Sequence, residues 1–268
     1  MDRKRKNNRT ALVTGAAGGI GQAICEVFIE AGYEVIGVDR RRTGNRPYKI
    51  LNFDISKFGT GAEECETFCE QVEQMTDGGL DVLVNNAATQ IVKPIEEITP
   101  QDWDITLQTN LLAPFWLIQR FLPQLRAAKG CVVNIASIHA NVTKPRFTVY
   151  ATSKGALVAL TRVLAIELAP DVRVNAVIPA ATDTPMLRAG FGDNIAGLKA
   201  LASYHPLGRI AKAREIANVT LFLAGPLASF MTGSALSVDG GIGACLHDPV
   251  STEADAASAV ELAAGACR

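Results

Sequence analysis

Short, strongly apolar segments alternate with longer amphipathic segments from residue 10 to residue 241. The short segments end at polar residues or glycine, as buried strands do, whereas the longer ones have the spacing of helices. We expect strands at residues 10–15, 33–39, 48–54, 80–87, 130–137, 172–179 and 235–240. We expect helices at residues 19–31, 60–76, 100–128, 148–169 and 212–225. This alternation predicts an α/β fold with a parallel sheet of about seven strands and helices on both faces.

Such a doubly wound sheet of Rossmann type binds its ligands at the carboxyl ends of the strands, so we expect function to cluster there. We assign residues 10–243 to a single domain, preceded by a basic tail at 1–9 and followed by a tail at 244–268 that is either helical or disordered. Residues 180–210 break the alternation with scattered Gly, Pro, Asp and Phe, which indicates a lid or binding loop.

Composition narrows the classes of partner. The 268 residues carry a net charge of −1, so no overall positive field attracts nucleic acid. The apolar runs are shorter than the ~20 residues that a membrane span needs, and the basic N-terminus lacks the apolar core of a secretory signal. Six cysteines are scattered without a CxxC pair, which favours free thiols over a metal site. We therefore expect a cytoplasmic protein without metal.

The stretch ALVTGAAGGIGQAI at residues 11–24 predicts a strand, a glycine-rich turn and a helix, which together can cradle a phosphate. A P-loop is excluded because Gln22, and not lysine, follows Gly21. The glycines satisfy TGxxxGxG (Gly15, Gly19, Gly21) and GxxGxxG (Gly15, Gly18, Gly21) at once. The turn therefore predicts a dinucleotide site but leaves the type of fingerprint open.

Asp39 ends the second predicted strand, 18 residues after Gly21. A carboxylate at this place binds the adenosine ribose 2′-hydroxyl of NAD and repels the 2′-phosphate of NADP. Arg40, Arg41 and Arg42 follow directly and could pair with such a phosphate. We predict NAD as the cofactor and keep NADP as the alternative.

The sequence YATSK places Tyr150 and Lys154 four residues apart, on one face of a predicted helix. Ser137 ends a predicted strand 13 residues upstream, and NNAA at residues 85–88 ends another. Together with the glycine-rich turn, these residues predict a catalytic site beside the dinucleotide.

The chain resembles the short-chain dehydrogenase/reductase family over about residues 9–243. The matching pieces are TGAAGGIG, the pair Asp54 and Ile55, NNAA, Asn110, Ser137, Tyr150 with Lys154, DTPM at 183–186 and SVDGG at 237–241. The resemblance favours the TGxxxGxG fingerprint, because GxxGxxG relatives such as nucleotide-sugar epimerases generally carry an additional C-terminal domain, which we do not expect here.

The resemblance implies an NAD(P)-dependent oxidoreductase that transfers a hydride between the nicotinamide and a secondary alcohol or ketone. Tyr150 would be the general acid and base, which requires a downward pKa shift of about three units from the ordinary tyrosine value near 10. Lys154 would lower that pKa and hold the nicotinamide ribose, Ser137 would bind the substrate oxygen, and Asn110 would hold a water in a proton relay.

The predicted cofactor-binding residues are Gly15, Ala17, Gly18, Gly19, Ile20, Gly21, Asp39, Arg40, Asp54, Ile55, Asn86, Ala87, Tyr150, Lys154, Pro179, Thr182 and Thr184. Two positions depart from the family pattern: Ala88 replaces the glycine of NNAG, and Ala180 replaces the glycine after Pro179. A methyl group at Ala180 restricts the backbone beside the expected nicotinamide.

The predicted substrate-binding residues are Ser137, His139 and Tyr150, in a pocket for a small-molecule alcohol or ketone. Further candidates for its wall are Gln90, Phe147, Met186, Phe191 and Tyr204. Family resemblance also implies a homodimer or homotetramer. Two alternatives stay open at this point: a dinucleotide-sensing binding protein without catalysis, and an NADP-dependent carbonyl reductase that uses Arg40.

Overall fold

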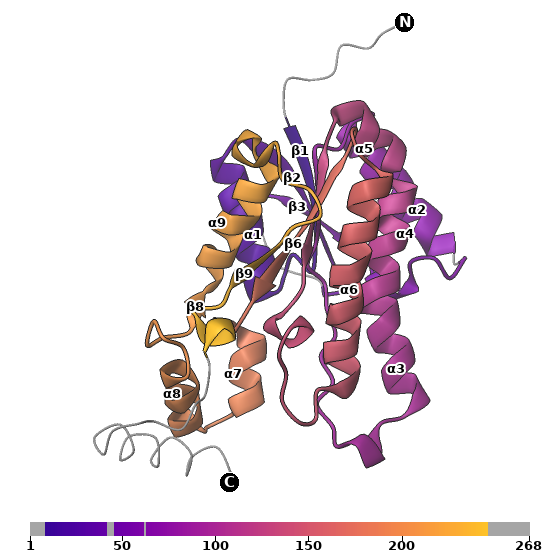
Figure 1. Cartoon of the computed structure of the whole chain (residues 1–268). Helices are drawn as coiled ribbons and strands as arrows, with labels where there is room; N and C mark the ends of the chain where they lie inside the picture. The colour runs from indigo at the N-terminus through magenta and orange to yellow at the C-terminus, as the bar shows by residue number, and fades with distance from the viewer. Residues whose placement is uncertain (1–8, 42–45, 62, 246–268) are drawn as a thin grey trace, which may run out of the picture.

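A computed structural model describes residues 9–41, 46–61 and 63–245. Its main sheet has seven parallel strands in the order β3-β2-β1-β4-β5-β6-β9 (Figure 1). The strands are β1 (Arg9–Thr14), β2 (Tyr33–Asp39), β3 (Lys49–Asn52), β4 (Val82–Asn85), β5 (Cys131–Ile135), β6 (Arg173–Pro179) and β9 (Ala235–Val238). The predicted doubly wound sheet is confirmed, and its order reverses between β1 and β4.

Helices cover both faces of this sheet (Figure 1). One face carries α1 (Gly19–Glu30) and α9 (Ala213–Ala224). The other carries α2 (Glu63–Thr76), α3 (Pro100–Leu107), α4 (Ala113–Arg120), α5 (Leu122–Ala128) and α6 (Thr148–Glu167). Side chains alternate between the two faces: Leu12 joins the hydrophobic cluster with α2 and α4, whereas Ala11 and Val13 join the cluster with α1 and α9. Burial on both faces explains why the strands are almost wholly apolar.

Within the described chain, α6 alone has the length and apolar composition of a membrane-spanning helix. Its inner side chains, among them Leu157, Val158 and Leu164, are buried in the protein. Packing in the core therefore accounts for that composition. The opposite side exposes Val163 and Ile166. The homo-oligomer that family resemblance implies stays a prediction.

The predicted helix at residues 100–128 is interrupted twice. A π-helical turn, η3 (Gln108–Leu112), separates α3 from α4. Pro114 has no N–H and cannot donate to the carbonyl of Asn110, so regular α-helical hydrogen bonding fails there. A second proline, Pro123, lies in the first turn of α5, and Phe121 between α4 and α5 has a non-helical backbone.

Residues 180–210 contain two helices that the sequence pattern did not predict. The short strand β7 (Thr182–Asp183) pairs with β8 (Ala211–Lys212), and α7 (Pro185–Phe191) and α8 (Ile195–Ser203) lie between them. Both helices begin at a side-chain cap, because Thr184 accepts from the Leu187 amide and Asn194 from the Gly197 amide. These local caps compensate for the weak amphipathic pattern.

Three predicted features lie outside the described residues. They are residues 1–8 of the basic tail, Arg42, and the C-terminal tail from residue 246 onward, which includes Cys267. Arg9 itself begins β1. The cysteines at positions 25, 65, 69, 131 and 245 are free thiols. The described part of the chain holds no cluster of three or more His, Cys, Asp or Glu side chains that could bind a metal ion.

Candidate active site

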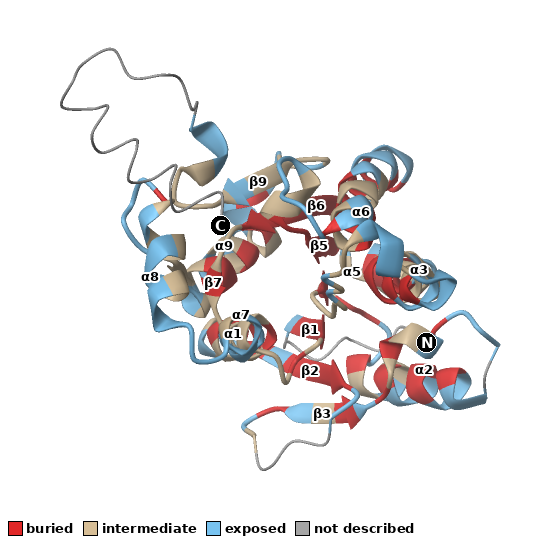
Figure 2. Ribbon diagram, turned by 90° about the horizontal axis from the view of Figure 1, so that it is seen from below, coloured by how far each residue is buried: buried red, intermediate tan, exposed pale blue. Residues whose placement is uncertain are grey.

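A cavity of about 1170 Å³ lies along the carboxyl ends of the strands. Figure 2 looks onto these ends, with α1, α7 and α8 on one side and α3 and α6 on the other. The volume of the cavity exceeds the ~300–1000 Å³ of an ordinary small-molecule site, and this size suits a dinucleotide together with a substrate. The topology therefore gathers one large site at the edge where the sequence predicts it.

Every predicted cofactor and substrate residue lines this cavity: Gly15, Ala17, Gly18, Gly19, Ile20, Gly21, Asp39, Arg40, Asp54, Ile55, Asn86, Ala87, Ser137, His139, Tyr150, Lys154, Pro179, Thr182 and Thr184. Of the further wall candidates, Gln90, Phe147, Met186 and Phe191 line it and Tyr204 does not. Asn110 is fully buried behind the wall.

The glycine-rich turn can accommodate a pyrophosphate. Gly15 has a φ of +66°, and a Cβ on Gly21 would lie 2.1 Å from the Gly15 carbonyl oxygen. Both positions therefore require glycine. No side chain caps the first turn of α1, which leaves its N–H groups for an anionic ligand. A nicotinamide dinucleotide fits this cradle.

Asn86 braces the turn from the end of β4. Its side-chain amide donates to the carbonyl oxygens of Thr14 (2.9 Å) and Gly15 (3.2 Å). The Thr14 hydroxyl in turn accepts from the backbone amides of Asn86 and Ala87, both at 3.0 Å. Asn86 thus has a structural function in shaping the cradle, in addition to the cofactor contact that resemblance implies.

Asp39 lies beside the cradle and is 7% exposed. Its carboxylate accepts from the Ala17 amide at 3.0 Å and from the Arg41 amide at 3.0 Å, and the Arg41 guanidinium lies 3.2 Å away. Burial raises the pKa of Asp39, but the hydrogen bonds from Arg41 and Ala17 outweigh it, so the net pKa is lowered and the group is ionised. Arg41 is the arginine that pairs with Asp39, and Arg40, which the sequence analysis selected, also lines the cavity.

Tyr150 and Lys154 project from the first turns of α6 toward Ser137 at the end of β5. Lys154 is 2% exposed, and its Nζ donates to the Ile135 carbonyl oxygen at 2.8 Å and lies 5.9 Å from the centre of the Tyr150 ring. Burial lowers the pKa of Lys154 to about 8. Burial also raises the pKa of Tyr150, against an opposing effect of the nearby Ser137 hydroxyl. In the ligand-free protein, Tyr150 is therefore held in its protonated form.

Asn110 lies in the π-helical turn and braces α6, the helix that carries Tyr150 and Lys154, from behind. Its Oδ1 accepts from the Thr89 amide at 2.8 Å, and its Nδ2 donates to the Thr89 carbonyl and to the Ser153 hydroxyl, each at 2.9 Å. Ser153 donates onward to the Tyr150 carbonyl at 2.7 Å. The side chain of Asn110 is thus fully used in joining η3, the segment after β4 and α6.

Three other predicted cofactor residues have local structural bonds. The Asp54 carboxylate accepts from the backbone amide (3.0 Å) and the hydroxyl (2.8 Å) of Ser56. Thr182 donates to the Ala180 carbonyl at 3.1 Å, and the Thr184 side chain lies against Gly19, where a Cβ would be 2.8 Å from Thr184 Cγ2. The last contact brings α7 against the start of α1, so the segment after β6 closes over the cradle.

His139 belongs to an aromatic wall at the end of the cavity that holds Ser137 and Tyr150, the predicted substrate end. Its ring stacks on Phe147, with centroids 4.2 Å apart, and meets the Tyr150 ring edge-on at 5.8 Å. Nδ1 lies 2.8 Å from the Thr143 hydroxyl. Burial, aided by the charge of Lys144, lowers the pKa of His139 to about 4, so the ring is neutral at physiological pH.

Sequence reasoning missed several residues of this wall. Thr89, Val92, Val142, Thr143, Lys144, Asn194, Leu201 and His205 line the cavity. They come from loops and from α8, and no motif marks their positions. These residues reach the cavity only because the loops and α8 fold over the carboxyl ends of the strands.

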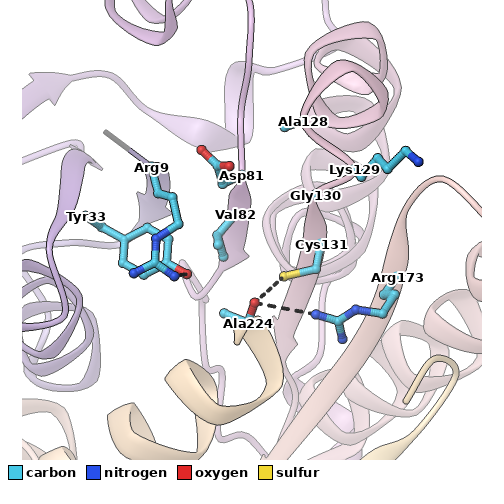
Figure 3. A pocket seen from close by; sticks show the side chains of 10 residues that line it. All are labelled: Arg9, Tyr33, Asp81, Val82, Ala128, Lys129, Gly130, Cys131, Arg173 and Ala224. Carbon is cyan, nitrogen blue, oxygen red and sulfur yellow. Dashed lines mark hydrogen bonds between the residues drawn. The ribbon is translucent and has the colours of Figure 1, made fainter. Parts of the chain in front are cut away.

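A second pocket, of about 110 Å³, lies at the opposite, amino ends of the strands (Figure 3). Four of its polar side chains pair within the protein. Arg9 stacks over the Tyr33 ring, 4.2 Å from its centroid, and both the Cys131 thiol and the Arg173 guanidinium donate to the Ala224 carbonyl oxygen (Figure 3). We interpret these contacts as structural, because they join the amino ends of the strands to one another and to the end of α9.

Comparison with known proteins agrees with this geometry. A family model described as enoyl-(acyl carrier protein) reductase matches residues 15–243. The chain is 36% identical to the L-xylulose reductase of Bos taurus over 248 residues, which are 88% of this chain and 97% of that protein. It is 33% identical to the cyclopentanol dehydrogenase of a Comamonas species, over 88% of this chain and 98% of that protein.

Solved structures also match. The ligand-free aldohexose dehydrogenase of Thermoplasma acidophilum has a TM-score of 0.84 and 31% identity, covering 91% of this chain and 97% of its own. The 3-ketoacyl-(acyl-carrier-protein) reductase of Brucella melitensis, complexed with NADH, has a TM-score of 0.78 and 29% identity, covering 88% and 98%. ElxO with NADP bound has a TM-score of 0.79 and 25% identity, covering 89% and 100%.

The family model, the near full-length alignments with relatives and the geometry of the site agree with one another. The chain belongs to the short-chain dehydrogenase/reductase family and is an NAD(P)-dependent oxidoreductase of alcohols and ketones.

Proposed function

We propose that this protein is an NAD-preferring dehydrogenase of secondary alcohols that uses Tyr150 as its general acid and base. The preference for NAD rests on Asp39. Its ionised carboxylate lies 3.0 Å from the Ala17 amide, inside the cradle, where it can accept from a ribose 2′-hydroxyl but repels a 2′-phosphate. Arg41 offsets part of this charge, but its side chain is 59% exposed, so it is well screened by solvent.

When bound, the nicotinamide supplies or accepts the hydride. In ketone reduction the Ser137 and Tyr150 hydroxyls bind the carbonyl oxygen, and Tyr150 donates the proton that this oxygen needs as the carbonyl carbon receives the hydride. In alcohol oxidation the Tyr150 oxygen takes the hydroxyl proton. The Lys154 ammonium stabilises the tyrosinate left on Tyr150 after reduction. Asn110 and Ser153 hold the start of α6, and so Tyr150, in place.

Calorimetry on the unmodified protein is expected to give an affinity for NAD⁺ about tenfold or more above that for NADP⁺. With NADP⁺, the buried Asp39 carboxylate loses the ribose 2′-hydroxyl as a hydrogen-bond donor and faces the negative 2′-phosphate instead. Asp39→Ala should reduce this difference by weakening NAD⁺ binding and relieving the repulsion. Arg41→Ala is the matched control: because Arg41 offsets part of the Asp39 charge, its loss should weaken NADP⁺ binding and widen the preference for NAD⁺. Tighter binding of NADP⁺ by the unmodified protein would overturn the proposed preference.

The rate of ketone reduction is expected to fall at alkaline pH. Because the pKa of Lys154 is about 8, its charge is complete well below pH 8 and is lost above it. Tyr150, whose pKa is raised, stays protonated over the same range. The plot of kcat/KM against pH should be flat below about pH 8 and then decline about tenfold per pH unit. Lys154→Arg, which keeps a charge at all these pH values, should lack the decline; a rise above pH 8 in the unmodified protein would contradict the assignment.

A further inference from the structure

His205 lies two residues after the end of α8 (Ile195–Ser203), and one of its ring nitrogens has no hydrogen-bond partner in the described chain. The residue is 3% exposed, and its Nδ1 lies 2.9 Å from the Leu201 carbonyl oxygen. A carbonyl oxygen only accepts, so Nδ1 carries a proton and, in the neutral ring, Nε2 is an acceptor. Nε2 is buried and has no hydrogen-bond partner in the described chain. A buried acceptor left in this way is costly, which points to a donor from outside the protein.

The ring borders the substrate end of the active-site cavity. A Cβ on Gly240 would lie 3.4 Å from the Cβ and Cδ2 atoms of His205, and a Cβ on Gly243 would lie 3.2 Å from the Ile138 side chain. The turn at residues 240–243 therefore joins His205 to Ile138, the neighbour of Ser137. The His205 ring therefore lies on the side of the cavity that holds Ser137, and away from the adenosine end at Asp39.

The chemistry of the surroundings narrows the donor. The two acidic residues of the cavity lining, Asp39 and Asp54, follow β2 and β3 at the adenosine end. The substrate end carries Lys144, whose Nζ lies 5.1 Å from the centre of the Phe147 ring. Among the described lining residues, a substrate ammonium group would meet a like charge and no carboxylate at this end. The reacting oxygen is taken by Ser137 and Tyr150. The donor is therefore neutral, and a second, separate hydroxyl group is the neutral donor that we assign to an alcohol or ketone substrate.

We propose that His205 is a specificity-determining residue whose Nε2 accepts a hydrogen bond from a second hydroxyl group of the substrate. The inference rests on the proposed function and adds a substrate class to it. Diols, hydroxyketones and sugars are then preferred over alcohols and ketones with a single oxygen, because only they bring a second hydroxyl or carbonyl-linked hydroxyl group to Nε2.

The test compares cyclohexanol with the 1,2-, 1,3- and 1,4-cyclohexanediols as substrates with NAD⁺. We expect at least one diol to have a kcat/KM about tenfold to hundredfold above that of cyclohexanol, since a site that pairs a hydroxyl discriminates against the analogue without it. His205→Asn keeps a donor for the Leu201 carbonyl but removes the acceptor at the Nε2 position, and it should reduce this ratio to about one. His205→Gln keeps an acceptor near the Nε2 position and loses the Leu201 bond, and it should retain most of the ratio.

Each other outcome is decisive. A ratio near one in the unmodified protein overturns the inference, because a water then satisfies Nε2 as well as the substrate does. Loss of the ratio in the Gln variant but not in the Asn variant overturns it too, since His205 would then act by anchoring α8 through Leu201. If no probe is turned over although calorimetry shows NAD⁺ binding, the proposed function itself fails and the inference fails with it. Thermal unfolding of both variants checks that they fold.

Discussion

Tyr150→Phe is expected to lower kcat for alcohol oxidation and for ketone reduction by roughly 10²–10⁴-fold. The substitution removes one hydroxyl and keeps the ring that packs edge-on against His139 and Phe147. Ser137 and Lys154 remain, so the substrate can bind but finds no group that gives or takes its proton. The affinity for NAD⁺ should change less than twofold, because the cradle around Gly15 and Asp39 is untouched.

The measurement is nicotinamide absorbance for turnover, with calorimetry for NAD⁺ binding. Tyr204→Phe is the matched control, since Tyr204 does not line the cavity, and it should keep the unmodified rate. Turnover of Tyr150→Phe within tenfold of the unmodified enzyme would contradict the role of Tyr150. The same experiment tests the alternative of a dinucleotide-sensing protein without catalysis, for which the unmodified chain would bind NAD⁺ and turn over no alcohol.

Gly21→Ala is expected to abolish measurable NAD⁺ binding and to destabilise the protein. The new Cβ would lie 2.1 Å from the Gly15 carbonyl oxygen and 2.7 Å from the Asn86 side-chain nitrogen, so the backbone of the turn must move. We expect a loss in the free energy of unfolding at or above the ~1–3 kcal/mol typical of overpacking. A displaced turn no longer presents the first N–H groups of α1 to a pyrophosphate.

Gly155→Ala provides the control for this substitution. Gly155 lies inside α6, has no unusual φ, and a Cβ there meets nothing nearer than the Ala140 carbonyl oxygen at 3.9 Å. The alanine should be neutral or stabilise by up to ~1 kcal/mol through helix propensity. Thermal unfolding and NAD⁺ calorimetry of both variants check the prediction. An unchanged NAD⁺ affinity in Gly21→Ala would show that the cradle does not depend on the close approach of Gly21 to Gly15.

The order of elements could be predicted closely because each strand is buried on both sides and each crossover helix has a long apolar face. The interruption at η3 was missed, although its cause is visible in the sequence as Pro114, because an uninterrupted apolar pattern such as NLLAPFWLI does not reveal where backbone hydrogen bonds fail. The helices α7 and α8 were missed because their capping side chains, Thr184 and Asn194, are weak signals among glycines and prolines.

Within the site, the prediction was strongest where residues share one element. The spacing of Tyr150 and Lys154 on α6 follows from helix geometry alone, and the cradle follows from a strand, turn and helix that are contiguous. The prediction was weakest for long side chains on loops, because their direction depends on the path of the loop backbone. Arg40 and Arg41 are adjacent and chemically alike, and only the path of the chain after β2 turns Arg41 toward Asp39.

By itself, the sequence determined the parallel sheet, the dinucleotide cradle, Asp39 at the end of β2 and the Tyr150 and Lys154 pair, because these depend on local periodicity and on contiguous residues. Only the tertiary structure decided that Asn86 braces the cradle and that Asn110 reaches α6 through Ser153. It alone also decided that the His205 ring lies buried at the cavity wall, with one nitrogen unpaired among the described residues. These contacts join segments that are far apart in the chain. They arise from how elements pack over the sheet, which no local pattern encodes.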